Sequence, residues 1–404
     1  MGMSALEFLC DIRFHRSFVF QGSGATRRSK PIRVSYADYG DQHSDAVVLF
    51  CGALVGGRFC YSPLDGLAKA YNVRIIHPDR PGIGGSDPVE LHERIPIWLE
   101  MVPQLLNHLK IPHVAIASHS GGVIYALNTI LTHPHLLHPT NPYVTFFAPW
   151  VHHSHSGITH LKATEFLPAP VIGKFASMAK FVNTNVMPLA GLSSSFIHGI
   201  MDSFHYSTPP PAPVPLTPTN TVSRSASICS LDRPDVLNLD DQKVVEQLRR
   251  LILEYLYAES IDGVSEDAKL FLKKPSSIQW CSPSIFWSDI DYAVPLLSKL
   301  IQEASGNGQI QRKWTIDTFH AQADNMVGEK GRIWFDQCWR NPSSTPSIDH
   351  VGTQTVGTER EPSFEYRSEI VRGSEHNYLM DPAYGAAEKW LQRVREAFPQ
   401  IEEV

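Results

Sequence analysis

Cysteine is scarce in this chain, and its few cysteines follow no pattern. The 404 residues contain six, with no CxxC pair and no repeated spacing. Neither a disulfide framework nor a zinc site is therefore indicated, and we expect reduced thiols.

Long apolar runs and basic blocks are also missing. No segment reaches about 18 uncharged apolar residues, and the N-terminal stretch MGMSALEFLCDIRFHRSF carries Glu7 and Asp11 where a signal peptide is apolar. We therefore expect a soluble cytoplasmic protein without stable membrane insertion. The net charge of -6 has no basic block to oppose it, which argues against nucleic acid as a partner. Nothing in the sequence predicts the oligomeric state.

What is present is the composition of a globular protein, 43% hydrophobic and 19% charged, arranged as strands that alternate with helices. Runs rich in β-branched and aromatic residues predict strands at 16–20, 32–40, 46–52, 73–79, 113–120 and 143–150. Helix-like segments lie at 61–71, 93–110 and 121–132. The later four strands are almost wholly apolar, which is typical of parallel strands covered on both faces. This βαβ series predicts a mostly parallel, twisted sheet.

The pattern changes after Trp150. Loosely apolar helices are predicted over 158–204, the stretch 208–219 (TPPPAPVPLTPT) is rich in proline, and an amphipathic helix follows at 240–258. The sheet then resumes at 313–324, and a second strand is expected at 364–373 before a final helix. We interpret residues 1–150 and 312–404 as one α/β core. Residues 151–311 are then an inserted, mainly helical cap that contains the proline-rich loop.

A serine stands at the junction between one predicted strand and the next helix, in the sequence IASHSGG. A strand, a serine flanked by small residues and then a helix is the pattern of a nucleophile elbow, in which a strained turn exposes the hydroxyl. The usual window is G-x-S-x-G, and here Ser118 replaces the first glycine while Gly122 keeps the second. The alternative interpretation of Ser120 is a turn serine in a non-catalytic loop.

With this turn the chain resembles the α/β-hydrolase superfamily, in its serine-nucleophile branch. Two further stretches carry the resemblance, VVLFCGALVGGR and HPDRPGIGGSD. The resemblance implies an eight-stranded, mostly parallel sheet flanked by helices, with Ser120 as nucleophile and the backbone amides of Ala53 and Gly121 as the oxyanion hole. It implies no cofactor and no metal. The DRPGIGGS turn and the segment HAQADNMVGEKGRIWFDQCW are similar to a fungal branch of the superfamily.

The family order of serine, acid and histidine admits two assignments. The first pairs Asp324, at the end of TIDTFHAQAD, with His376, and the second pairs Asp291 with His320. We prefer the first because it uses every later strand and helix once. In the first assignment Asp324 has a rival role as a helix N-cap, which is common for aspartate.

These residues predict a serine hydrolase that cleaves an ester or related acyl bond. The apolar cap favours a moderately large apolar small molecule as substrate. The resemblance to a fungal branch suggests a role in tailoring polyketides or other secondary metabolites. The alternative is a protein that keeps the α/β-hydrolase fold without hydrolysis, as a ligand receptor or a cyclisation or acyl-transfer catalyst.

Overall fold

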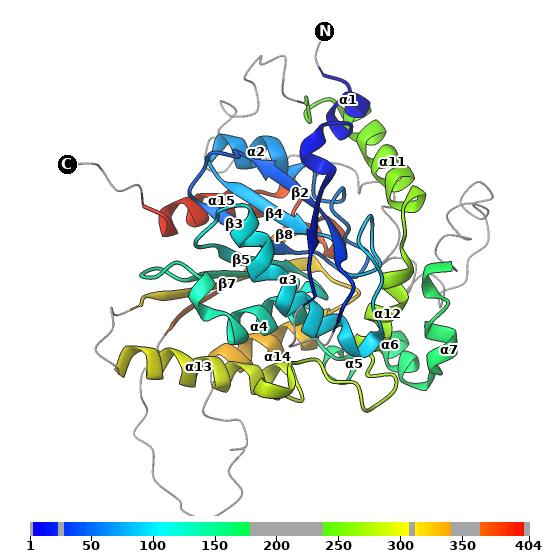
Figure 1. Cartoon of the computed structure of the whole chain (residues 1–404), viewed down its shortest axis with the longest axis vertical. Helices are drawn as coiled ribbons and strands as arrows, with labels where there is room; N and C mark the ends of the chain where they lie inside the picture. The colour runs from blue at the N-terminus through cyan, green and yellow to red at the C-terminus, as the bar shows by residue number, and fades with distance from the viewer. Residues whose placement is uncertain (1–2, 23–27, 178–236, 307–311, 341–363, 400–404) are drawn as a thin grey trace, which may run out of the picture.

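A computed structural model describes residues 3–22, 28–177, 237–306, 312–340 and 364–399 (Figure 1). The predicted proline-rich loop at 208–219 lies outside the described residues.

Eight strands form one sheet in the order β1-β2-β4-β3-β5-β6-β7-β8. Their bounds are Arg16–Phe20 (β1), Ile32–Gly40 (β2), Val47–Cys51 (β3), Arg74–Pro78 (β4), Ala115–His119 (β5), Tyr143–Phe147 (β6), Trp314–Ala323 (β7) and Phe364–Glu375 (β8). β2 pairs antiparallel with both neighbours, and every other pairing is parallel. The predicted eight-stranded, mostly parallel sheet is confirmed.

The central strands are apolar because they are covered on both faces. Every residue of β3, β5 and β6 is buried, as expected of parallel strands between two helical layers. One layer holds α2 (Leu64–Ala70) and α15 (Ala386–Ala397), with α1 (Ala5–Leu9) nearby. The other holds α3 (Arg94–His108), α4 (Gly122–Thr132), α13 (Ile290–Gly306) and α14 (Gly328–Arg340). Figure 1 shows the sheet between these two groups.

Helices fill the described part of the chain between β6 and β7. They are α5 (His153–Ser156), α6 (Thr159–Ala163), α7 (Ala169–Ile172), α11 (Gln242–Ala258), α12 (Asp262–Phe271) and α13. Figure 1 shows α11 and α12 one after the other along one side of the molecule, and α7 contacts α12. α13 instead packs against α4 and α14 beside the sheet. The boundary of the predicted cap at 151–311 therefore stays a prediction.

The parallel strands bring distant parts of the chain to one edge of the sheet. β3, β5, β7 and β8 share one direction, so their carboxyl ends, Cys51, His119, Ala323 and Glu375, face the same edge. This is the edge at which open α/β sheets bind ligands. Among the described helices, none is long and apolar enough to span a membrane.

Candidate active site

Ser120 occupies a strained turn between β5 and α4. Its φ is +50°, in the left-handed region that residues other than glycine rarely adopt. The turn is held because the Ser120 amide donates to the Phe147 carbonyl at 2.9 Å, and the Trp150 amide donates to the Ser120 carbonyl at 3.1 Å. Backbone strain that neighbours enforce in this way is a mark of a functional turn.

Close packing explains the small residues around the serine. A Cβ on Gly122 would lie 2.1 Å from the Cys51 carbonyl oxygen, so α4 can start against the end of β3 only with glycine there. A Cβ on Gly121 would lie 2.4 Å from the ring of Phe271 in α12. Two residues before the nucleophile position, Ser118 is fully buried, and the structure accommodates the departure from glycine.

A series of hydrogen bonds links Ser120 to a histidine and a carboxylate. His376 follows β8 directly, and its Nε2 lies 2.9 Å from Ser120 Oγ. Its Nδ1 lies 2.9 Å from Oδ2 of Asp324, the first residue after β7. A carboxylate can only accept, so Nδ1 carries the proton and Nε2 is left to accept the serine hydroxyl. All three side chains are at most 10% exposed.

Asp324 is fixed by backbone amides as well as by the histidine. Its Oδ1 accepts from the amides of Met326 at 2.9 Å and Val327 at 2.7 Å, in the turn that leads into α14. Burial raises the pKa of Asp324, but the charge and hydrogen bond of His376 together with these amides outweigh it and hold the pKa below its usual value. The carboxylate therefore stays ionised beside the imidazole.

Both ring nitrogens of His119, the residue before the serine, form hydrogen bonds with groups other than Ser120. Its Nε2 lies 3.0 Å from the backbone carbonyl of His376, and its Nδ1 lies 2.9 Å from the Tyr61 hydroxyl. The carbonyl can only accept, so Nε2 carries the proton and Tyr61 donates to Nδ1. Burial, followed by repulsion from His376, lowers the pKa of His119 to about 3. His119 is thus neutral, and it braces the backbone of His376.

The two backbone amides predicted to hold an oxyanion differ in whether they already have a hydrogen-bond acceptor. The Ala53 amide donates to the Tyr61 hydroxyl at 2.9 Å. The Gly121 amide, at the N-terminus of α4, has no acceptor among the described residues. Tyr61 therefore receives a bond from Ala53 and gives one to His119, which sequence reasoning did not foresee.

The alternative pair is not brought together. His320 Nε2 lies 2.8 Å from Asp336 Oδ1 on α14, rather than next to Asp291 on α13. Asp336 also accepts from the hydroxyls of Tyr366 and Ser368, at 2.8 and 2.9 Å. This cluster joins α14 to the outer strands of the sheet.

A cavity of about 160 Å³ opens beside Ser120. Its walls are mainly apolar and come from both the core and the segment between β6 and β7. Besides Ser120, His119 and His376, the lining residues include Leu54, Val55, Tyr61, Leu64, Trp150, Ile252, Leu256, Phe271, Met326 and Met380. Arg249 and Asp381 also reach the cavity and form an ion pair at 2.9 Å.

The order of the strands in the sheet and the strained serine turn after β5 together identify the fold. The chain has the α/β-hydrolase fold. No family model matches the sequence, and no curated protein matches it.

Three solved structures illustrate the likeness in fold. A carboxylesterase from the thaumarchaeon Nitrososphaera gargenis is 12% identical, with a TM-score of 0.48 over 94% of this chain and 99% of its own. Epoxide hydrolase A from Mycobacterium thermoresistibile is 13% identical, with a TM-score of 0.49 over 94% and 98%. The enol-lactonase from Burkholderia xenovorans LB400 is 12% identical, with a TM-score of 0.47 over 91% and 97%. At such low sequence identities, these structures give no information about the substrate of this protein.

Proposed function

We propose that this protein is a serine hydrolase that cleaves an ester or a related acyl bond. The observation that carries the proposal is the continuous series of hydrogen bonds from Asp324 through His376 to Ser120, with Ser120 and His376 lining an apolar cavity. A serine hydroxyl becomes an effective nucleophile when a histidine accepts its proton and a carboxylate stabilises the resulting imidazolium.

In the proposed reaction Ser120 Oγ attacks the acyl carbon while its proton passes to His376 Nε2. The bond to the leaving alcohol then breaks as Nε2 returns that proton to the departing oxygen. Water, deprotonated by the same nitrogen, attacks the acyl-serine. The bond from the acyl carbon to Ser120 Oγ then breaks as Nε2 returns the proton to Oγ, which releases the acid and restores the serine. Asp324 keeps the tautomer that leaves Nε2 free to accept.

The oxyanion is held by the amides of Gly121 and Ala53. The free Gly121 amide at the start of α4 supports the first assignment, and the helix dipole adds to it. For Ala53, the substrate oxygen replaces the Tyr61 hydroxyl as the acceptor of the amide. Tyr61 keeps its bond to His119 during this exchange.

The proposed substrate is a moderately large apolar small molecule. Apolar residues of α11 and α12, such as Ile252, Leu256 and Phe271, line the cavity and support the proposal that the insertion acts as a cap. A role in tailoring polyketides or other fungal secondary metabolites is the narrower form of this proposal, and it rests on the sequence resemblance alone.

The test uses a fluorophosphonate probe and p-nitrophenyl esters of increasing chain length. We expect the parent protein to be labelled and to turn over the esters, and Ser120→Ala to do neither. Asp324→Asn is expected to lower kcat on the order of 10³- to 10⁴-fold, because the wrong histidine tautomer is then favoured. Asp336→Asn removes a carboxylate that holds another buried histidine, and it is the matched control.

The outcomes separate the alternatives. A parent protein that is neither labelled nor active contradicts hydrolysis and favours a ligand receptor or a cyclisation catalyst. A larger loss of kcat in Asp336→Asn or Asp291→Asn than in Asp324→Asn would overturn the assignment of the acid.

A further inference from the structure

Arg80, two residues after the end of β4, binds three successive backbone carbonyls of the loop after β3. Its Nη1 donates to the carbonyl of Gly52, and its Nη2 donates to those of Ala53 at 2.6 Å and Leu54 at 2.8 Å. The side chain is 2% exposed. In the sequence, Arg80 belongs to the stretch HPDRPGIGGSD, which carries the family resemblance but assigns this arginine no role.

The first of these bonds fixes the direction of the Ala53 amide. The carbonyl of Gly52 and the amide of Ala53 belong to one planar, trans peptide group, so they point in opposite directions. Because the guanidinium holds the carbonyl from one side, the N–H is held toward the other, where Tyr61 and the cavity lie. A cation on the carbonyl also polarises the peptide and strengthens its N–H as a donor.

The guanidinium is in turn fixed by a carboxylate from the insertion. Asp267, in the middle of α12, accepts from Arg80 Nε at 2.7 Å and from Arg94 at 2.7 Å, and it is fully buried. Burial raises the pKa of Asp267, but the charges of Arg94 and Arg80 outweigh it and hold the pKa below its usual value. With Nε, Nη1 and Nη2 all engaged, Arg80 has little freedom to rotate.

We propose that Arg80 is a positioning residue that orients the Gly52–Ala53 peptide for the oxyanion, and that Asp267 extends this hold to α12. The proposal rests on the proposed hydrolase function. Under this proposal, the geometry of the reaction centre depends on Asp267, a residue of the insertion that does not contact the substrate cavity.

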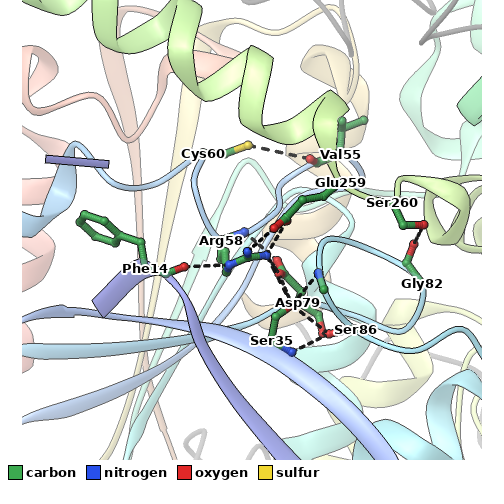
Figure 2. A network of polar contacts seen from close by, with 11 residues as sticks. Phe14, Ser35, Val55, Arg58, Cys60, Asp79, Gly82, Ser86, Glu259 and Ser260 are labelled. Carbon is green, nitrogen blue, oxygen red and sulfur yellow. Dashed lines mark hydrogen bonds and ion pairs between the residues drawn. The ribbon is translucent and has the colours of Figure 1, made fainter. Parts of the chain in front are cut away.

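Two other buried arginines provide controls. Arg94 shares Asp267 and is as buried as Arg80, but its other bonds go to the Pro81 carbonyl and the Tyr125 hydroxyl, and none goes to the carbonyls of residues 52–54. Arg58 also joins the core to the insertion, since it binds Asp79 at 2.6 Å and Glu259 at 2.7 Å (Figure 2).

The experiment compares Arg80→Gln, Arg80→Lys and Asp267→Asn with Arg94→Gln and Arg58→Gln. Thermal unfolding, hydrogen exchange of residues 52–57, ester kinetics and inhibition by an alkyl boronic acid are measured on each. We expect Arg80→Gln to lower kcat by about 100-fold, with KM within about threefold, and to weaken the tetrahedral boronate by a similar factor. Lysine cannot reach all three carbonyls, so Arg80→Lys restores only part of kcat.

The controls are expected to unfold at lower temperature while kcat stays within about threefold of the parent. Exchange of residues 52–57 is expected to accelerate in the Arg80 and Asp267 variants more than in the controls. Equal losses of kcat in all five variants, or unchanged exchange in Arg80→Lys and Asp267→Asn, overturn the proposal. A parent without ester turnover refutes the hydrolase function instead, and exchange then decides whether Arg80 fixes this loop.

Discussion

The carboxylate of Asp324 serves two structures at once. One oxygen accepts the amides of Met326 and Val327 before α14, and the other accepts His376. The sequence offers a capping role and a role beside histidine as rival explanations, and the fold combines them. The capping bonds hold the carboxylate in one orientation, which a residue that must fix a histidine tautomer requires.

Tyr61 provides a test of how the Ala53 amide is used. We expect Tyr61→Phe to leave kcat/KM unchanged or to raise it a few-fold, because the substrate oxygen no longer competes with the hydroxyl. The free energy of unfolding should fall by about 1–3 kcal/mol, because His119 Nδ1 loses its donor. Ester kinetics and urea unfolding measure the two effects.

The matched control is Tyr39→Phe. Tyr39 is fully buried, and its hydroxyl has no partner among the described residues, so its removal should change neither quantity appreciably. A fall of kcat/KM beyond about tenfold in Tyr61→Phe alone would mean that the Tyr61 hydroxyl is itself a donor to the oxyanion.

Tyr61 and Asp267 were beyond prediction from the sequence for a common reason. Each acts through tertiary contacts with residues far away in the chain, Tyr61 with His119 and Asp267 with Arg80. No fixed spacing or motif accompanies such contacts. Ser120, by contrast, carries a local signal, since strand, tight turn and helix must follow one another within a few residues.

At the scale of elements, α4 can pack closely against β3 only because Gly122 has no side chain. In Gly122→Ala the new Cβ would meet the backbone of Cys51 at 2.1 Å, and backbone cannot move aside as a flexible side chain can. We expect a loss of about 3 kcal/mol in the free energy of unfolding, because α4 must shift away from the sheet. Urea unfolding at neutral pH measures it.

Gly57→Ala is the control for this change. A Cβ there would make only ordinary contacts, the nearest at 3.4 Å to Asp79 Oδ1, so stability should change by less than about 1 kcal/mol. Similar losses in both variants would show that the cost comes from the backbone rather than from the clash with β3.

Strands were easier to predict than the partners of individual side chains. The strand predicted at 113–120 is observed at Ala115–His119, because an apolar run flanked by turn residues marks a buried parallel strand. The choice between His320 and His376 needed the fold. Side chains alternate along β7, so Phe319 packs into one helical layer while His320 turns toward Asp336 on the other side.

At the scale of the whole molecule, ion pairs join the helical segment between β6 and β7 to the rest of the chain near the junction of α11 and α12. Glu259 binds Arg58 at one end, and Ser260 contacts the turn at Gly82 (Figure 2). Asp267 binds Arg80 one helix later. Arg58 also binds Asp79, and Asp267 also binds Arg94, so each of these links is one part of a larger buried cluster of charges.

Two buried neutral histidines make the stability of the molecule depend on pH. Burial, with the charges of Arg80 and Arg58 next, lowers the pKa of His77 to about 3, and the pKa of His119 is lowered to a similar value. In the unfolded chain a histidine titrates near 6.5, so below that pH the unfolded state binds more protons than the folded state. The contribution of these two neutral histidines to the free energy of unfolding is therefore fully present above pH 6.5. It is lost as the pH falls from 6.5 toward 3.

His119→Gln isolates one of these contributions. Glutamine can still accept from Tyr61 and donate to the His376 carbonyl, but it does not titrate. From pH 7 to pH 5 we expect the parent to lose about 2 kcal/mol more in the free energy of unfolding than this variant does. Urea titrations at the two pH values measure the difference. His43 is exposed, so His43→Gln is the control and should lose as much free energy of unfolding as the parent. An equal loss in His119→Gln and the parent would mean that His119 is already protonated in the folded protein at pH 5.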